Sequence, residues 1–271
     1  MPVINTNVAA IKARSNFERV QRDMDQSIAR LSSGKRINTA ADDAAGQAIS
    51  GRMESQIRGL TMQVKNARDA QSLVDTTEGA MQEITGILQR MRELAVQASS
   101  GIATTADKGY LDTEVEALIA EIEAISVNTT FNEQTILSDV GFSFYTDINV
   151  TGTKISTTVA NMSTSVLGVT ALEVEIGTTA AAAIVAIDQA LTTVNDKRTH
   201  MGAISNRLDH VIDNLTNVIA NTAAAQSRIQ DADYAVETTA LTRATILQQA
   251  ATSMIAQANA NKNSIMMLIQ G

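Results

Sequence analysis

The sequence contains no cysteine, no tryptophan and a single proline, Pro2. Without cysteine the chain cannot build a disulfide framework or a cysteine-ligated zinc site. Its two histidines, His200 and His210, offer little material for metal or acid–base chemistry. Aromatic residues make up only 3% of the chain, so a thick globular core is not expected, because aromatic side chains normally supply much of the core area. With its one proline at the start, the chain can form long uninterrupted helices.

Charge and hydropathy exclude further classes of function. The formal net charge of −8 disfavours general binding of nucleic acid, which needs a basic face against the phosphates. No apolar run approaches the roughly 20 residues that span a bilayer, so no membrane partner is expected. The N-terminus also lacks the charged-then-apolar order of a cleaved secretory signal. We therefore expect neither nucleic acid nor membrane as a partner, and no cleaved signal peptide.

Chemistry-bearing residues are too scattered to predict an enzyme. Neither histidine has a nucleophile partner at a matched spacing, and no convergent catalytic set is present. The adjacent Asp42 and Asp43 suggest a metal site, but neighbouring carboxylates on a helix point in different directions. Their place before a run of helix formers favours capping of a helix start instead. We expect no enzymatic activity, no cofactor and no metal.

The informative pattern is an amphipathic helix at each end of the chain. Apolar residues recur there at steps of three and four, which is the pattern of a coiled-coil seam. Because neither helix can bury its apolar side alone, we expect the two ends to pair with each other and with further copies of the chain. The residues of these expected assembly seams are Phe17, Val20, Met24, Ile28 and Leu31 at the start, and Leu247, Ala251, Met254, Ala258, Ile265 and Leu268 at the end.

Between the ends, helical periodicity predicts long helices over about 44–99, 107–128 and 180–229. The first helix should start after an N-cap at Asn5 or Thr6 and end at Gly34. Over about 136–179 the period changes to two, with Thr151-Gly152-Thr153 as a turn, which predicts a β-hairpin within a loop-rich insert. The expected fold is mainly α: a long antiparallel helical bundle or coiled-coil rod built from both chain ends, with one small β-hairpin insert.

Four motifs in this sequence resemble those of bacterial flagellins. The segment LSSGKRINTAADDAAG, residues 31–46, is similar to their N-terminal signature, and QRMRELAVQ, residues 89–97, to a second block. Residues 227–234 and 246–250 resemble the C-terminal signature. The chain departs from the family pattern at Lys35 and at Phe131-Asn132-Glu133, which replaces a common Asn-Gly turn. The resemblance covers roughly residues 1–135 and 180–271. The short stretch between them implies a flagellin without outer variable domains.

This resemblance implies a structural function. A flagellin-like chain is expected to be exported without a cleaved signal peptide and to assemble into the extracellular flagellar filament, a helical tube used for swimming. Its implied partners are further copies of itself, an export chaperone, the filament cap and the hook-junction proteins. Residues 1–40 with 230–271 would form an inner terminal-helix domain. Residues 41–229 would form the rod domain, including the insert at about 136–179.

Two other functions are weighed against the filament subunit. A hook–filament junction protein shares the terminal signatures, but the intact Gln248-Gln249 block disfavours that reading. A non-polymerising coiled-coil scaffold or signalling protein is the alternative from another class, and it would explain neither the hairpin insert nor the two flagellin-like ends.

Arg90, Leu94 and Glu114 form a second candidate site. The matching positions of some flagellins form a surface patch that a host toll-like innate immune receptor recognises, so the resemblance implies such a patch here. The simpler interpretation is that Arg90 and Glu114 form an ion pair between helices or subunits and that Leu94 packs within the filament.

Overall fold

The computed structural model describes residues 6–138, 141–145, 154–158, 161–172 and 177–270. Its elements confirm a mainly helical fold, and the predicted long helices lie within three residues of their expected bounds. They are α1 (Val8–Ser33), α2 (Ala44–Ala98), α3 (Thr105–Asn128), β1 (Thr130–Phe131), β2 (Gln134–Thr135), β3 (Gly141–Tyr145), β4 (Lys154–Thr158), α4 (Thr164–Leu167), α5 (Gly177–Gln230) and α6 (Tyr234–Gln270).

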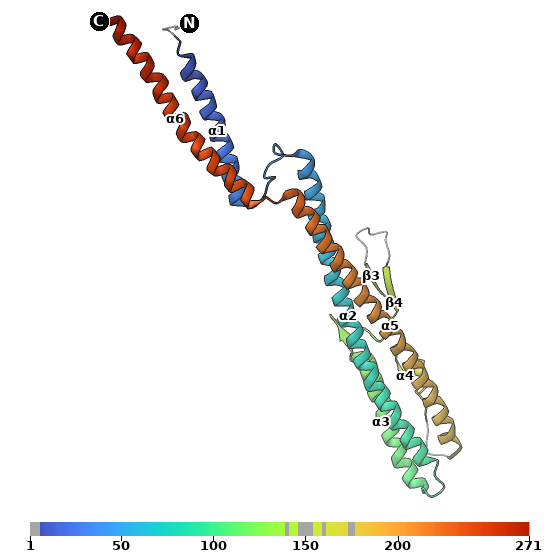
Figure 1. Ribbon diagram of the computed structural model, residues 1–271. Coiled ribbons are helices and arrows are strands. Elements are labelled where there is room, and N and C mark those ends of the chain that lie inside the picture. Colours follow the sequence, from blue (N-terminus) through green and yellow to red (C-terminus); the bar gives the residue numbers. More distant parts are fainter. Residues whose placement is uncertain (1–5, 139–140, 146–153, 159–160, 173–176, 271) are drawn as a thin grey trace. The chain divides into compact units, whose positions relative to one another are not determined.

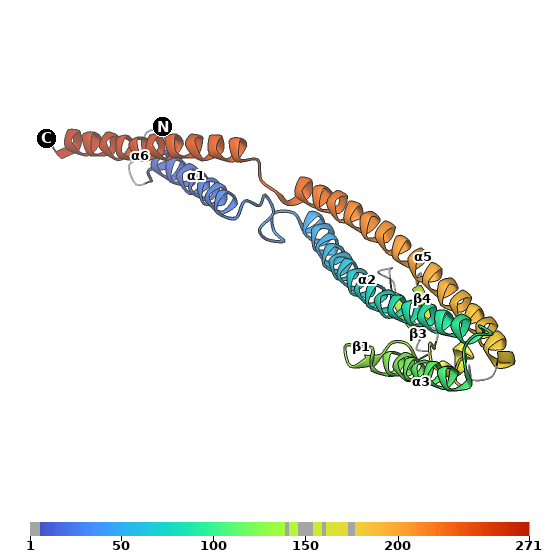
Figure 2. The same ribbon diagram turned by 90° about the horizontal axis from the view of Figure 1, so that it is seen from below.

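The chain packs as two units, residues 1–57 with 220–271 and residues 58–219. In the first unit α1 and α6 run antiparallel and side by side (Figures 1 and 2). The N-cap of α1 is Asn7 rather than the expected Asn5 or Thr6. The Asn7 Oδ1 accepts a hydrogen bond from the amide of Ala10 at 3.1 Å. As predicted, the helix ends at Gly34, whose φ of 70° suits a residue without a Cβ.

In the second unit α2 and α5 run antiparallel. Three polar contacts between them show this, because residues later in α2 pair with residues earlier in α5. These contacts join Gln71 to Asp209 at 2.8 Å, Arg198 to Glu78 at 3.1 Å and Arg92 to Asp188 at 2.7 Å. After a short turn α3 returns beside α2. The start of α3 is fixed by a capping box in which Thr104 and Asp107 each bind the other's backbone amide.

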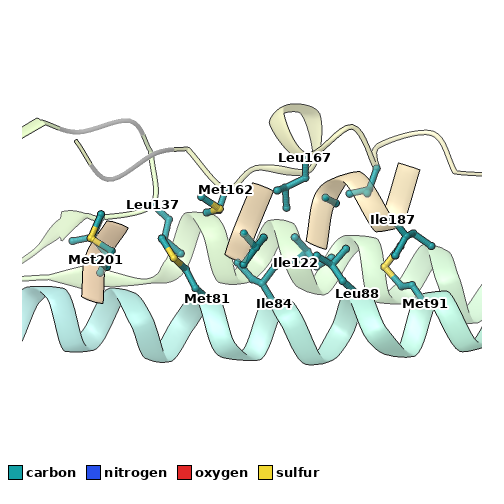
Figure 3. Packing of buried hydrophobic residues seen from close by; sticks show 14 of the residues in the cluster. Met81, Ile84, Leu88, Met91, Ile122, Leu137, Met162, Leu167, Ile187 and Met201 are labelled. Carbon is teal, nitrogen blue, oxygen red and sulfur yellow. The ribbon is translucent and has the colours of Figure 1, made fainter. Parts of the chain in front are cut away.

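The core of the second unit is a layer of aliphatic and methionine side chains from α2, α3, α5 and the insert (Figure 3). Methionine fills this core where aromatic residues are scarce, because its flexible thioether adapts to irregular gaps. The largest fully buried side chains are Met81, Ile84, Leu88, Met91, Leu94, Ile122, Ile136, Leu137, Met162, Ile187, Met201 and Leu208.

The insert contains the predicted β-hairpin, with β3 and β4 paired antiparallel from Gly141–Thr158 to Tyr145–Lys154. Its expected turn at Thr151-Gly152-Thr153 lies outside the described residues. Two elements in this region were not predicted: the β1–β2 hairpin and the four-residue helix α4. The latter is held on α3 by Glu123, whose carboxylate accepts hydrogen bonds from the Thr164 amide at 2.9 Å and hydroxyl at 2.8 Å.

Candidate assembly surfaces

The seam between α1 and α6 follows a strict alternation of three- and four-residue steps on both helices, as a two-stranded coiled coil requires. Small and polar side chains occupy many of its positions, so the helices bury little apolar area for their length. The seam residues, all buried or half-buried, are Ala10, Ala13, Phe17, Val20, Met24, Ser27 and Leu31 of α1, and Glu237, Leu241, Ala244, Gln248, Ala251, Ile255 and Ala258 of α6.

Polar contacts occur at three heights along this seam. The Asn7 side-chain amide donates to the carbonyl of Ala258 at 3.1 Å, and that of Gln248 donates to the Gln21 side-chain oxygen at 2.6 Å. At the other end, an ion pair joins Arg30 to a nearly buried carboxylate on α6. Because such contacts form in only one alignment, they fix the register of two helices whose apolar contacts are weak.

Beyond α1 and α6 the two connecting segments pair with each other. The amide of Arg36 donates to the Gln230 carbonyl at 2.7 Å, and the amide of Ala232 donates to the Gly34 carbonyl at 3.0 Å, on either side of a β-bridge between Lys35 and Asp231. Lys35, a departure from the family pattern, thus contributes its backbone to this bridge. The two segments between helices are therefore ordered by each other.

The sequence predicts that the acidic pair caps the start of a helix, and the structure confirms this for Asp43, whereas Asp42 caps the turn that precedes it. Asp43 accepts the Gly46 amide at 2.9 Å and so serves as the N-cap of α2. Asp42 accepts the amides of Asn38 and Thr39, together with the side chain of Gln26. These hydrogen bonds, chiefly that from the Thr39 amide, lower the pKa of Asp42 below its ordinary value.

The structure divides the expected assembly seams between two surfaces. Within the α1–α6 seam lie Phe17, Val20, Met24, Leu31, Ala251 and Ala258, whereas Ile28, Leu247 and Met254 are exposed at 47%, 47% and 63%. These three side chains therefore lie outside the α1–α6 contact, and their part in assembly between copies stays a prediction. Ser27 takes the seam position expected for Ile28, while Gln248 and Ile255 take those expected for Leu247 and Met254. The side chains of Ile265 and Leu268 lie outside the described part of the chain.

An exposed apolar face runs along α6 outside the seam, and we call it the outer α6 face. It comprises Val236, Ile246, Leu247 and Met254, each at least 47% exposed. A groove beside it is lined from α1 by Lys12, Asn16 and Arg19 and from α6 by Leu247, Ala250 and Met254, among others. The charged residues of α6 between Tyr234 and Asn261 are only Glu237, in the seam, and Arg243. A helix face this apolar and this poor in charge is suited to contact further protein.

The second candidate site is only partly on the surface. Arg90 of α2 lies 2.8 Å from Glu114 of α3 and 3.1 Å from Glu93, with about half of its side chain exposed. These carboxylates, Glu114 foremost, raise the pKa of the Arg90 guanidinium. Leu94, by contrast, is 1% exposed within the core. Its expected place on the surface beside Arg90 is wrong, because this side of α2 turns into the helical bundle.

The described residues hold no cluster of three or more histidine and acidic side chains that could bind a metal ion. Both histidines are exposed on α5. Of the helices in the described ranges, none is both long and apolar enough to cross a membrane.

Comparison with known proteins gives consistent matches at both ends. The model of the bacterial flagellin N-terminal helical region matches residues 4–141, and that of the C-terminal helical region matches residues 184–269. A flagellin of Halalkalibacterium halodurans is 40% identical over 271 residues, covering 99% of this chain and 100% of that protein. A Bacillus subtilis flagellin is 35% identical over 305 residues, covering 98% of this chain and 99% of that protein.

Two solved structures are similar. The crystal structure of Bacillus cereus flagellin has a TM-score of 0.52 at 32% identity, covering 60% of this chain and 94% of that one. A putative flagellar hook-associated protein from Vibrio parahaemolyticus has a TM-score of 0.62 at 15% identity, covering 70% of this chain and 100% of that one. At 15% identity the second likeness concerns the fold alone.

Proposed function

Because the chain belongs to the bacterial flagellin family and is a structural subunit of the flagellar filament, we propose that the outer α6 face joins one copy to the next. The observation that carries this proposal is the exposure of Ile246, Leu247 and Met254 on a nearly uncharged helix. Burial of apolar surface stabilises an interface by roughly 25 cal/mol per Å². A contact of this kind, repeated between unlike surfaces without closing into a ring, builds a helical filament.

In this proposal the α1–α6 seam has a supporting role: it fixes the alignment of the two helices and so holds the outer α6 face in one position. Residues 1–40 with 230–271 would form the inner domain of the filament and residues 41–229 its rod. The long antiparallel helices α2 and α5 support a stiff rod, since each exceeds 50 residues without a break.

Seeded assembly watched by electron microscopy tests the outer α6 face. We expect Leu247→Asp and Met254→Asp to abolish long filaments, because each copy would bury an unpaired carboxylate at its contact. Met62→Asp is the matched control: Met62 is 56% exposed on α2, close to the exposure of Met254. Near-normal filaments from both α6 variants would refute the assignment. If Met62→Asp abolished filaments to the same extent, the loss would not be specific to the outer α6 face.

A hook–filament junction protein is the rival within the same structural class. Full-length identity to flagellins favours the filament subunit, whereas the hook-associated protein from Vibrio parahaemolyticus has only the fold in common. The same microscopy separates them, because a junction protein would not extend seeds into long tubes. A non-polymerising scaffold would leave the seeds unchanged.

Export and partners extend this proposal. Flagellins act in the extracellular filament, and this chain would reach it without losing an N-terminal signal. An export chaperone, the filament cap and hook-junction proteins would be its further partners. Mass spectrometry of filaments sheared from cells should then find the N-terminal segment intact. A filament protein shortened at its start by a signal-peptide length would contradict this.

Recognition by a toll-like innate immune receptor is a second candidate function, now limited to Arg90 and Glu114. Their half-exposed ion pair leaves both charges accessible on the rod. Arg90→Ala should lower receptor activation by monomer at least tenfold, equivalent to about 1.4 kcal/mol, with circular dichroism unchanged. Arg92→Ala is the matched control, since Arg92 is equally exposed but pairs with Asp188 on α5. If both variants activated the receptor as strongly as wild type, recognition through Arg90 would be refuted.

A further inference from the structure

The sulfur atoms of this chain are unevenly protected. All of its sulfur is in 11 methionines, because it has no cysteine. Met81, Met91, Met162 and Met201 are completely buried in the rod core. Among methionines whose side chains the structure describes, only Met62 and Met254 are exposed by more than half, at 56% and 63%. A mild oxidant in water should therefore oxidise the exposed methionines faster than the methionines of the core.

The reaction itself is simple and complete. A hydroperoxide such as hydrogen peroxide transfers one oxygen atom to the thioether sulfur, the O–O bond breaks, and water is released. The sulfur loses two electrons and becomes a sulfoxide, while the peroxide is reduced. Susceptibility follows exposure, and the product is a polar, chiral group in place of a flexible apolar one. Because the core methionines are shielded, oxidation of the surface sulfur should leave the fold intact.

The two exposed methionines occupy different surroundings. Met62 lies on α2 of the rod. Met254 lines the groove between α1 and α6, among Leu247, Ala250 and Ala251 and opposite Lys12 and Arg19. A sulfoxide oxygen in this groove needs a hydrogen-bond donor once water is excluded. Leu247, Ala250 and Ala251 offer none, and Lys12 and Arg19 could donate to it only by giving up part of their own hydration.

We propose that Met254 is a reversible oxidation site that controls assembly: its thioether permits the outer α6 face to be buried, and its sulfoxide prevents that burial. The proposal rests on the proposed role of this face in the filament. It adds that oxidation of one sulfur atom by hydroperoxides stops filament growth without unfolding the subunit. Subunits already assembled would be protected, since the contact covers the sulfur.

The experiment treats full-length monomer with dilute hydrogen peroxide and maps sulfoxides by mass spectrometry. Met254 should oxidise at least tenfold faster than Met81 or Met91, with circular dichroism unchanged. Seeded growth should fall at least tenfold and recover after treatment with both methionine sulfoxide reductases and a thiol reductant, since one enzyme acts on each epimer. Monomer oxidised at Met254 that grows like untreated monomer overturns the proposal and leaves the filament function untouched.

Variants identify the responsible sulfur, with each treated protein compared with its own untreated sample. Met254→Leu should lose less than half of its growth on treatment, whereas Met62→Leu should lose as much as wild type. Met254→Gln, a permanent polar replacement, should grow poorly without any oxidant. If treated Met254→Leu loses growth as wild type does, another methionine is responsible and the proposal fails. If untreated wild type forms no filaments, the proposed function itself fails.

Discussion

Arg30 of α1 and Glu237 of α6 form an ion pair across the terminal helices, with the arginine Nη1 3.0 Å from the glutamate Oε1. Only 25% of the arginine side chain and 10% of the glutamate side chain are exposed. The pair lies at the end of the seam nearest the paired connecting segments. Its shielding makes it more consequential than a surface ion pair, because an unpaired charge here is poorly hydrated.

We expect Arg30→Ala to destabilise the α1–α6 pair by about 2–3 kcal/mol, since it leaves the Glu237 carboxylate without its cation. Hydrogen exchange of α1 and α6 amides measures this change locally. The exposed pair of Arg14 and Glu18 is the control, with side chains 79% and 52% exposed. Arg14→Ala should change stability by less than about 0.5 kcal/mol. Similar effects from the two variants would show that shielding is unimportant.

Gly46, near the start of α2, should not tolerate a methyl group. A Cβ there would collide with the Asp43 carboxylate and lie 2.6 Å from the Ile37 Cδ1. Since that carboxylate caps α2 and Ile37 is buried, Gly46→Ala should destabilise the connector by about 1–2 kcal/mol. Gly59→Ala is the opposite case, because apart from the adjoining residues and backbone of α2 itself no described atom lies within 4 Å of its Cβ position. It should stabilise α2 by about 0.5–1 kcal/mol. Thermal denaturation of both variants checks the difference in sign.

The β1–β2 hairpin turns through two residues with positive φ, Asn132 at 50° and Glu133 at 65°. This is the backbone of a tight hairpin turn in which glycine is favoured at the second position. Replacing Glu133 by glycine should remove the steric cost of the left-handed conformation and stabilise the chain by about 1 kcal/mol. A urea titration would detect it. Glu133→Ala keeps the Cβ and should give no such gain; an equal gain would point to the lost charge instead.

The contact between Glu123 and Thr164 should depend on pH. Hydrogen bonds from the Thr164 amide and hydroxyl lower the pKa of Glu123. A lowered folded-state pKa means that the contact adds stability above the unfolded-state value of about 4.3. This stability is lost as the pH falls through the lower folded-state pKa. The amide NMR shift of Thr164 should follow this titration, whereas in Glu123→Gln it should not. A wild-type shift constant down to pH 2 would contradict the prediction.

The long helices were predictable because apolar periodicity persists over many turns and no proline interrupts it. The register of the terminal seam was not, because polar side chains occupy parts of it. Ser27 is buried where Ile28 was expected, and Gln248 takes the seam position beside exposed Leu247. A rule that selects only apolar residues moves the seam by one residue at such places. The steps of three and four, continued through polar positions, give the correct face.

Leu94 shows a different limit of sequence-based prediction. The resemblance to flagellins implied a surface patch of Arg90, Leu94 and Glu114, and Arg90 and Leu94, four residues apart, do lie near each other along α2. The boundary between the buried and the exposed side of α2 lies between these two residues. Met91, Leu94 and Ala95 face the core, while Arg90 pairs with Glu114 at the edge of the core. Only the packing of α3 and α5 decides where this edge lies. Helix α4, with four residues, is too short for any periodic signal.

The partners of α2 within the rod lie far along the chain. Glu78 pairs with Arg198, which is synthesised 120 positions later, and Gln71 pairs with Asp209, which is synthesised 138 positions later. At ~5–20 residues synthesised per second, the ribosome needs roughly 7 to 28 seconds to supply the second member of the longer pair. Local contacts with α3 form sooner, but the core shared with α5 cannot close in that interval. Translation thus leaves the apolar side of α2 uncovered until α5 has been synthesised, and the rod core can close only after that point.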